Sequence, residues 1–215
     1  MLNTYFDKIF WINCNTRADR YLRMQARLKL LGVEAERVEC VRGAKVQIPI
    51  PLISTRTLNA GEVGCFLSHR MLYQRIQKEG WQRTLILEDD AEFVKGFAER
   101  FEDVYEAVPT DWQMLYLGRW NYDYLVTKER GQNGERVGLN TLLDEKHGHG
   151  IYAADRNWLT HAYAVDQSAI EHILTHTSEI KGGIDEVLAQ IQSELKVYAI
   201  HPALIHQDNS RSSIR

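Results

Sequence analysis

Leu85-Ile-Leu-Glu-Asp-Asp90 is the stretch that says most about this fold, because an apolar run stops there at three consecutive carboxylates. Adjacent negative charges repel one another and gain little from burial, so we expect something positive beside Glu88, Asp89 and Asp90. Hard cations such as Mn²⁺ and Mg²⁺ take oxygen ligands and often bind through one or two carboxylates plus substrate phosphates. The stretch therefore predicts a core strand that ends at a divalent metal.

Alternate side chains of a strand face the same way, so Glu88 and Asp90 are predicted to point together while Asp89 turns aside toward a neighbouring loop. We assign the metal to Glu88 and Asp90, held directly or through water. The alternative is a solvated acidic turn after an edge strand.

The composition is that of an ordinary globular protein: 215 residues, 44% hydrophobic and 26% charged. We expect one domain over residues 1–215. The formal net charge of −3 argues against stable binding of nucleic acid. Because no apolar run is long enough to cross a bilayer, we expect a soluble, cytoplasmic protein whose contact with a membrane is at most peripheral.

The three cysteines, Cys14, Cys40 and Cys65, are odd in number and lack the close paired spacing of zinc sites. Reduced thiols in a cytosol-like compartment are the simplest interpretation, and a disulfide framework is not expected.

Short apolar runs rich in β-branched residues alternate along the chain with helix-like stretches. The alternation predicts an α/β fold with a mostly parallel sheet flanked by helices. Ligands of such sheets bind beyond the carboxyl ends of strands, where Asn13 and the acidic triplet fall. Strands are predicted at 8–13, 36–41, 84–87, 114–117, 162–165 and 197–200, and helices at 18–31, 59–80, 97–108, 168–174 and 184–195.

Two helices carry more detailed signals. Leu22, Ala26 and Leu30 recur at i, i+4 spacing with Leu28 and Leu31 beside them, and predict the buried face of the first helix. Asn59 with Glu62 three residues later predicts a capping box at the start of the next one.

Residues 43–58 are predicted to form a loop. The long, glycine-rich stretch 119–157 is typical of a lid, a binding loop or disorder.

Three ordered motifs together resemble glycosyltransferase family 25, which includes bacterial lipooligosaccharide galactosyltransferases and animal collagen galactosyltransferases. The motifs are Trp11-Ile-Asn-Cys-Asn-Thr-Arg-Ala-Asp-Arg20, Ala60-Gly-Glu-Val-Gly-Cys-Phe-Leu-Ser-His69 and Leu85-Ile-Leu-Glu-Asp-Asp90. Weaker likeness reaches residues 111–118, 160–163, 184–185, 207 and 213–214. The resemblance implies a GT-A type, Rossmann-like fold, a nucleotide-sugar donor, commonly UDP-galactose, a Mn²⁺ or Mg²⁺ ion and inversion at the anomeric carbon. Cys14, Asn15 and the glycine-rich middle depart from the family pattern.

The resemblance and the residue chemistry together assign roles to ten side chains. Asp185 is the predicted catalytic base, although it could instead favour a helix N-terminus through the dipole. His206 is the predicted third metal ligand, with His201 as its rival. Arg20 could instead be paired with a carboxylate, and Ser68 and His69 could instead make core hydrogen bonds. The nucleotide-sugar is assigned to Asn13, Arg17, Arg20, Ser68, His69 and Asp89, and the metal to Glu88, Asp90 and His206.

The predicted activity is metal-dependent, inverting transfer of a hexose, galactose from UDP-galactose, onto a glycan or glycolipid such as lipooligosaccharide. Two alternatives stay open: transfer to protein, viral glycan or modified nucleic acid, and a non-catalytic nucleotide-sugar-binding module. A nucleotidyltransferase is less favoured because no glycine-rich triphosphate loop follows the first strand.

Overall fold

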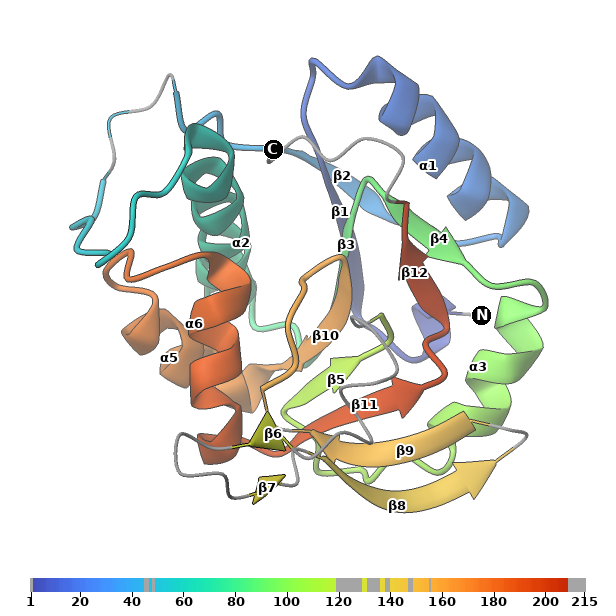
Figure 1. Cartoon of the computed structure of the whole chain (residues 1–215). Coiled ribbons are helices and arrows are strands. Elements are labelled where there is room, and N and C mark those ends of the chain that lie inside the picture. The colour runs from blue at the N-terminus through green and yellow to red at the C-terminus, as the bar shows by residue number, and fades with distance from the viewer. Residues whose placement is uncertain are drawn as a thin grey trace.

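An eight-stranded sheet forms the centre of the molecule in the computed structural model (Figure 1). The structure describes residues 2–44, 47, 49–118, 129–130, 136–137, 140–146, 149–154 and 156–208. Strand order across the sheet is β2-β1-β3-β10-β5-β11-β9-β8. The strands are β1 (Lys8–Asn13), β2 (Glu36–Glu39), β3 (Arg83–Glu88), β5 (Met114–Tyr116), β8 (Asn140–Lys146), β9 (His149–Ala154), β10 (Ala162–Asp166) and β11 (Val197–His201).

The α/β class is confirmed, and the sheet is mixed. β1 runs parallel to both β2 and β3, and β5 runs parallel to β11, as the alternation predicts. β10 is antiparallel to β3 and β5, and β9 is antiparallel to β11 and β8. Because β10 begins where β3 ends, with Ala162 opposite Leu87, the residues just before β10 lie beside the acidic triplet. The backbone N–H of Glu88 donates to the carbonyl of His161 at 2.9 Å.

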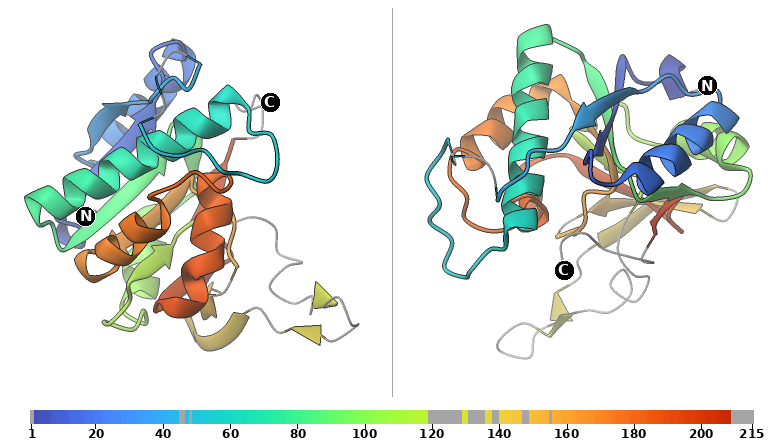
Figure 2. Two further views of the ribbon diagram at one scale, coloured as in Figure 1. Left: turned by 90° about the vertical axis from the view of Figure 1, so that its left-hand side faces the viewer. Right: turned by 90° about the horizontal axis from the view of Figure 1, so that it is seen from above.

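Helices cover both faces of the sheet (Figures 1 and 2). On one face lie α2 (Ala60–Glu79), α5 (Gln167–His176) and α6 (Ile184–Ile191), and on the other lie α1 (Ala18–Leu30) and α3 (Phe97–Tyr105). Each layer has its own apolar core, because a strand buried on both faces sends alternate side chains to each side. Along β3, Ile86 joins the core under α2 while Leu85 and Leu87 join the core under α1 and α3. No helix in the described ranges is long and apolar enough to span a bilayer.

The capping box of α2 is confirmed. Asn59 Oδ1 accepts the N–H of Glu62 at 2.9 Å, and Glu62 Oε2 accepts the N–H of Asn59 at 2.8 Å. Gly80 ends the helix in the left-handed conformation, with φ of 74°. The residues from which the two ends of α2 were predicted, Asn59 with Glu62 and Gly80, are therefore the ones that form those ends.

Replacing Asn59 with Ala should lower the free energy of unfolding by about 1 kcal/mol, because the Glu62 N–H loses its acceptor. Urea denaturation monitored by circular dichroism measures the change. Gln74→Ala, at an exposed position inside the same helix, serves as control and should leave the midpoint almost unchanged. Equal midpoints for Asn59→Ala and the parent would contradict the role of the cap.

The buried face of α1 differs from the prediction. Leu22 and Leu30 are exposed, with 63% and 88% of their surfaces accessible, whereas Arg20, Met24 and Leu28 are buried. The spacing of four residues was right and Leu28 is buried as expected, but the centre of the buried face is shifted by two positions from Leu22, Ala26 and Leu30. The reason is Arg20, whose guanidinium points inward to carboxylates and so places an arginine in an otherwise apolar stripe.

The glycine-rich stretch, predicted as a loop, contributes two strands to the edge of the sheet. β9 pairs with β11, and β8 pairs with β9 through a register shift between Leu142 and Asp144. β6 (Glu129–Arg130) and β7 (Arg136–Val137) form a separate short ladder. Other parts of the stretch, among them Gly131, Gly134 and Gly148, lie outside the described residues, as does the tail from Asn209.

A small second sheet returns the C-terminal part of the chain to the acidic triplet. β4 (Ala91–Phe93) follows the triplet directly and pairs antiparallel with β12 (Ile205–Gln207), with Gln207 opposite Ala91. The N–H of Asp208 donates to the carbonyl of Asp90 at 2.8 Å. This pairing brings Gln207 against the end of β3.

The expectation of reduced cysteines was wrong for two of the three residues. Cys14 and Cys40 form a disulfide, with Cα atoms 4.9 Å apart, and Cys65 is free. Parallel pairing of β1 with β2 places the two cysteines side by side, because each follows the end of its strand. Cys65 is therefore the one thiol to which the expectation of a reduced state still applies.

Removing the disulfide by a Cys14→Ser/Cys40→Ser double substitution should cost about 3.5 kcal/mol of stability, the loop-entropy estimate for cysteines 26 residues apart. Thermal unfolding with and without a dithiol reductant measures this. The reductant should destabilise the parent and leave the double variant unaffected. A parent that shows three titratable thiols before reduction would contradict the pairing.

Candidate active site

A cavity of about 330 Å³ opens at the carboxyl ends of β1, β2 and β3. Its walls come from the turn after β1, the loop after β2, the first half of α2, the acidic triplet and β12. Eight of the ten predicted site residues line it: Asn13, Arg17, Arg20, Ser68, His69, Glu88, Asp89 and Asp90. Three segments far apart in the sequence thus converge on one hollow.

Arg20 is the positive partner that the acidic triplet requires. Its Nη1 lies 2.8 Å from Asp89 Oδ1 and 3.0 Å from Asp90 Oδ2, and all three side chains are buried. Asn13 completes the arrangement by donating Nδ2–H to Asp89 Oδ2 at 2.7 Å and accepting from Arg37. Asp89 and Asp90 thus meet at one Arg20 nitrogen, while Glu88 contacts His69 and Thr160, so Asp89 does not turn aside from Asp90 as predicted. The Asp89 carboxylate, Asn13 and Arg20 all line the cavity.

Asp90 retains an unused ligand atom. Its Oδ2 accepts from Arg20 and, at 3.4 Å, from Gln207, but Oδ1 is buried without a hydrogen-bond partner among the described residues. Burial and the nearby charge of Glu88 raise the pKa of Asp90 to about 7. A buried carboxylate oxygen without a partner is costly. The donor set on this side of the cavity, carboxylate oxygens, is the one that Mn²⁺ and Mg²⁺ prefer, so the residues fit such an ion.

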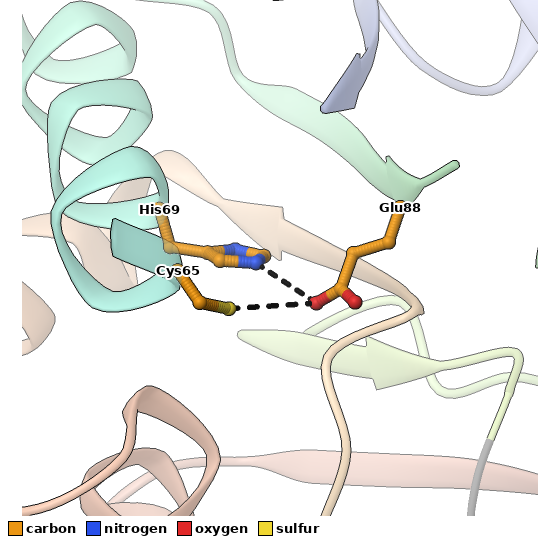
Figure 3. Close-up of side chains that lie close together, drawn as sticks. All are labelled: Cys65, His69 and Glu88. Atoms are coloured by element: carbon orange, nitrogen blue, oxygen red, sulfur yellow. Dashed lines mark hydrogen bonds and ion pairs between the residues drawn. The ribbon is translucent and has the colours of Figure 1, made fainter. Parts of the chain in front are cut away.

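Glu88 ends β3 and lies beside Cys65 and His69 of α2 (Figure 3) and Thr160 of the loop before β10. Its Oε1 accepts from Thr160 Oγ1 at 2.6 Å and from His69 Nε2 at 3.1 Å, while Cys65 Sγ lies 4.0 Å away. Burial raises the pKa of the Glu88 carboxyl, but the hydrogen bonds outweigh it and the pKa falls below its usual value. Glu88 is therefore a fixed carboxylate.

His69 links Glu88 to the core under α2. A carboxylate only accepts, so Nε2 of His69 donates, and in the neutral ring Nδ1 accepts from the Tyr163 hydroxyl at 2.8 Å. Tyr163 and Tyr73 oxygens lie 2.5 Å apart. His69 is fully buried and lines the cavity. Its bond to Tyr163 is the core hydrogen bond that the sequence analysis gave as the alternative role of this residue.

Cys65, His69 and Glu88 each offer an atom within 4.8 Å of the others, a set that would suit a softer ion such as Zn²⁺. Burial raises the pKa of the Cys65 thiol well above its usual range. Because the thiolate is the form that binds metal, this set fits a resident ion less well than the Asp90 side does.

Ser68 joins α2 to the loop after β2. Its hydroxyl donates to the Gly64 carbonyl at 2.7 Å and accepts the Val41 N–H at 2.8 Å. A Cβ built on Gly64 would lie 2.3 Å from the Val41 carbonyl oxygen, so only glycine permits this approach. These contacts hold the loop after β2 against α2, and Val41 and Ser68 both line the cavity.

A second cavity of about 180 Å³ adjoins the first and contains Asp185. Both cavities are lined by Cys65, Glu88 and Gln207, so Glu88 stands between them. Asp185 lies in the first turn of α6, where its Oδ1 accepts the N–H of Glu186 at 3.0 Å. Burial and then the charge of Glu88 raise its pKa, while backbone hydrogen bonds lower it.

Two predicted residues are placed differently from the expectation. His206 is exposed on β12, on the opposite face from Gln207, and it lines neither cavity. The structure therefore does not bring it to the acidic triplet, and Gln207 occupies the position expected for it. Arg17 lines the first cavity, but its guanidinium is paired with Asp19 at 3.0 Å and 3.1 Å.

Sequence reasoning missed several residues of the site. Thr160 holds Glu88, and Arg56, which lines the second cavity, contacts Glu62 and Glu186, both at 2.7 Å. Arg42, Cys14 and Cys40 line the first cavity. The likeness at 160–163 was a signal for Thr160. Cys14 lies in the first motif, where it departs from the family pattern, and Cys40, Arg42 and Arg56 lie outside all three motifs.

Comparison with known proteins supports the motif resemblance. The family model "Glycosyltransferase family 25 (LPS biosynthesis protein)" matches residues 6–188. The human "Inactive glycosyltransferase 25 family member 3" is 35% identical over 130 residues, which are 53% of this chain and 22% of that protein. Human "Procollagen galactosyltransferase 2" is 32% identical over 130 residues, covering 53% and 21%.

The chain thus spans about a fifth of the length of these relatives. Among solved structures, "Crystal Structure of A197 from STIV" covers 89% of this chain and 80% of that chain, at 10% identity and a TM-score of 0.43. That likeness is too low to bear on function. Since the family model covers residues 6–188, including both cavities' carboxylates, the chain belongs to glycosyltransferase family 25.

Proposed function

We propose that the chain is a metal-dependent, inverting glycosyltransferase that moves a hexose, galactose from UDP-galactose, onto a glycan such as lipooligosaccharide. The observation that carries the proposal is the pair of adjoining cavities with Glu88 between them. A transfer reaction needs space for a donor and an acceptor that meet at one point. The family's description and the galactosyltransferases among its relatives support the choice of sugar and glycan.

The first cavity suits the donor. Its acidic end offers the unpartnered Oδ1 of Asp90 together with Glu88, while Arg17 and Arg42 line other parts of it. A Mn²⁺ or Mg²⁺ ion held there would stabilise the negative charge that develops on the diphosphate leaving group. Arg20 and Asn13 hold Asp89 and Asp90 in place before any ligand binds, which reduces the reorganisation needed on binding.

The second cavity suits the acceptor. In an inverting displacement the acceptor hydroxyl oxygen bonds to the anomeric carbon, the bond from that carbon to the phosphate oxygen breaks, and a base takes the hydroxyl proton. Asp185 is our choice of base, because it is the carboxylate of the second cavity that has a raised pKa. We also propose that residues 1–215 form one domain.

The test is release of UDP from UDP-galactose in the presence of Mn²⁺, with and without a lipooligosaccharide acceptor. A thermal-shift screen of nucleotide-sugars with and without Mn²⁺ identifies the donor first, since ligand binding raises the apparent stability. UDP-galactose together with Mn²⁺ should stabilise the protein more than either does alone. Equal shifts for all nucleotide-sugars, and no UDP release with any of them, would contradict the proposal.

A second candidate function is binding of a nucleotide-sugar without turnover, which the names of the inactive relatives favour. It predicts the same thermal shift but no release of UDP. Labelled donor offered to glycan, protein and modified nucleic-acid acceptors distinguishes the remaining enzyme alternatives.

A further inference from the structure

Two histidines and a glutamate cluster at the end of α6 away from Asp185. His172 and His176 are one turn apart on α5, with ring centroids 4.3 Å from each other. Glu194 belongs to the 3₁₀ helix η2 (Gln192–Glu194), which follows α6, and its Oε2 lies 3.2 Å from His172 Nε2. One ligand atom of each residue lies within 4.8 Å of the other two. α5 and α6 lie side by side in Figure 2.

The hydrogen bonds leave the ring nitrogens ready to bind a cation. His176 Nδ1 is 3.0 Å from the carbonyl oxygen of His172. A carbonyl only accepts, so Nδ1 carries the proton and the neutral ring keeps its lone pair on Nε2. A backbone hydrogen bond of this kind is what fixes the tautomer of many metal-bound histidines.

His172 provides the second, independent observation. Its Nε2 is buried and has no hydrogen-bond partner among the described residues, although Glu194 Oε2 is only 3.2 Å away. The carboxylate is close but poorly aligned for a hydrogen bond. An ion between the two groups would bind both, and histidines at i and i+4 on a helix are a known arrangement for Zn²⁺.

We propose that His172, His176 and Glu194 form a binding site for a borderline transition-metal ion, of which Zn²⁺ is the representative, with water completing the coordination. The ligand chemistry differs from that of the Asp90 side, where oxygen atoms favour Mn²⁺ or Mg²⁺. The two sites should therefore be separable by choice of metal.

The site would fasten α5 to η2. Gln192, in η2, donates to the Tyr116 hydroxyl at 3.1 Å and to the Asn157 carbonyl at 2.8 Å, and it accepts the Asn157 N–H at 2.6 Å. η2 thus holds the segment that leads into β10 and Thr160. A bound ion would stabilise this junction without touching either cavity.

The experiment uses the full chain with Cys65→Ser, which removes the thiol that could bind zinc beside Glu88. Isothermal titration with ZnCl₂ in excess Mg²⁺ should show one bound Zn²⁺ per chain. His176→Ala and Glu194→Gln should each weaken the affinity roughly tenfold or more, as expected for loss of a ligand. Glu171→Gln, an exposed carboxylate of α5, is the matched control and should bind as the parent does.

Circular dichroism checks that each variant is folded, and Glu194→Gln, which alters a half-exposed side chain, keeps the test available should a histidine variant unfold. Absence of Zn²⁺ binding in the Cys65→Ser protein overturns the proposal. Binding with parental affinity in both His176→Ala and Glu194→Gln also overturns it.

Discussion

Asp90→Asn should slow Mn²⁺-dependent release of UDP from UDP-galactose by about 10²–10³-fold, the usual loss when one group that stabilises developing charge is removed. The Asp90 carboxylate is the one in the triplet with a fully buried oxygen that has no hydrogen-bond partner among the described residues. An amide in its place keeps the shape but lacks the negative charge that attracts a divalent ion. The thermal shift produced by Mn²⁺ should disappear together with turnover.

The substitution should leave the fold intact, because it relieves repulsion. Arg20 supplies one positive charge to both Asp89 and Asp90, and burial already makes the charged form of Asp90 costly. The amide oxygen of the substituted side chain can still accept from Arg20. We therefore expect the metal-free variant to be at least as stable as the parent.

Asp103→Asn, at an exposed position of α3, is the control and should behave as the parent in both assays. An Asp90→Asn protein with normal turnover and a normal Mn²⁺ shift would refute the metal assignment.

The part of the site that sequence could predict is the part that sheet geometry dictates. β1 and β3 are apolar, β-branched and parallel neighbours, so whatever follows their carboxyl ends must lie at one edge of the sheet. Asn13, Arg17, Arg20 and the triplet follow them and line one cavity. Their chemical roles stay predictions, because position alone does not show which atoms contact a ligand.

The errors come from residues whose environment depends on partners far along the chain. Arg20 is buried only because Asp89 and Asp90, some 70 positions away, neutralise it, so the apolar pattern of α1 indicated the wrong face. Cys14 and Cys40 meet because β1 pairs with β2, which no spacing reveals. β12 is only three residues long, and its pairing with β4 decides which side chains face the cavity. The sequence does not show this pairing, so it could not show that His206 faces away.

The edge of the sheet was missed for a different reason. β9 reads His-Gly-Ile-Tyr-Ala-Ala and β8 is largely polar, and neither shows the continuous apolar run by which the central strands were recognised. β9 pairs with β11, and β8 pairs with β9. Each pairing is favoured by the hydrogen-bonding groups at the edge of the preceding strand, which any extended neighbour can satisfy. Such tertiary pairing leaves little trace in local sequence.

Asp185→Asn should reduce acceptor-dependent transfer by about 10²–10⁴-fold, the range for loss of a general base, and should leave donor binding unchanged. Asp185 lines the second cavity and not the first, so the thermal shift with UDP-galactose and Mn²⁺ should match that of the parent. This separation distinguishes a base from a residue that merely supports the fold or the donor.

The pH profile supplies a readout that a structural role would not produce. Burial and the charge of Glu88 raise the pKa of Asp185 in the folded protein, and only the deprotonated carboxylate can accept a proton. Transfer by the parent should therefore fall as the pH drops through that raised pKa, and this acid limb should be lost in Asp185→Asn. Asp185→Glu should recover part of the rate, while Glu179→Gln, on the loop before α6 and outside both cavities, should behave as the parent. Normal transfer by Asp185→Ala with intact donor binding would assign the base to another group, and Glu88, which both cavities share, is the carboxylate that would then have to be tested.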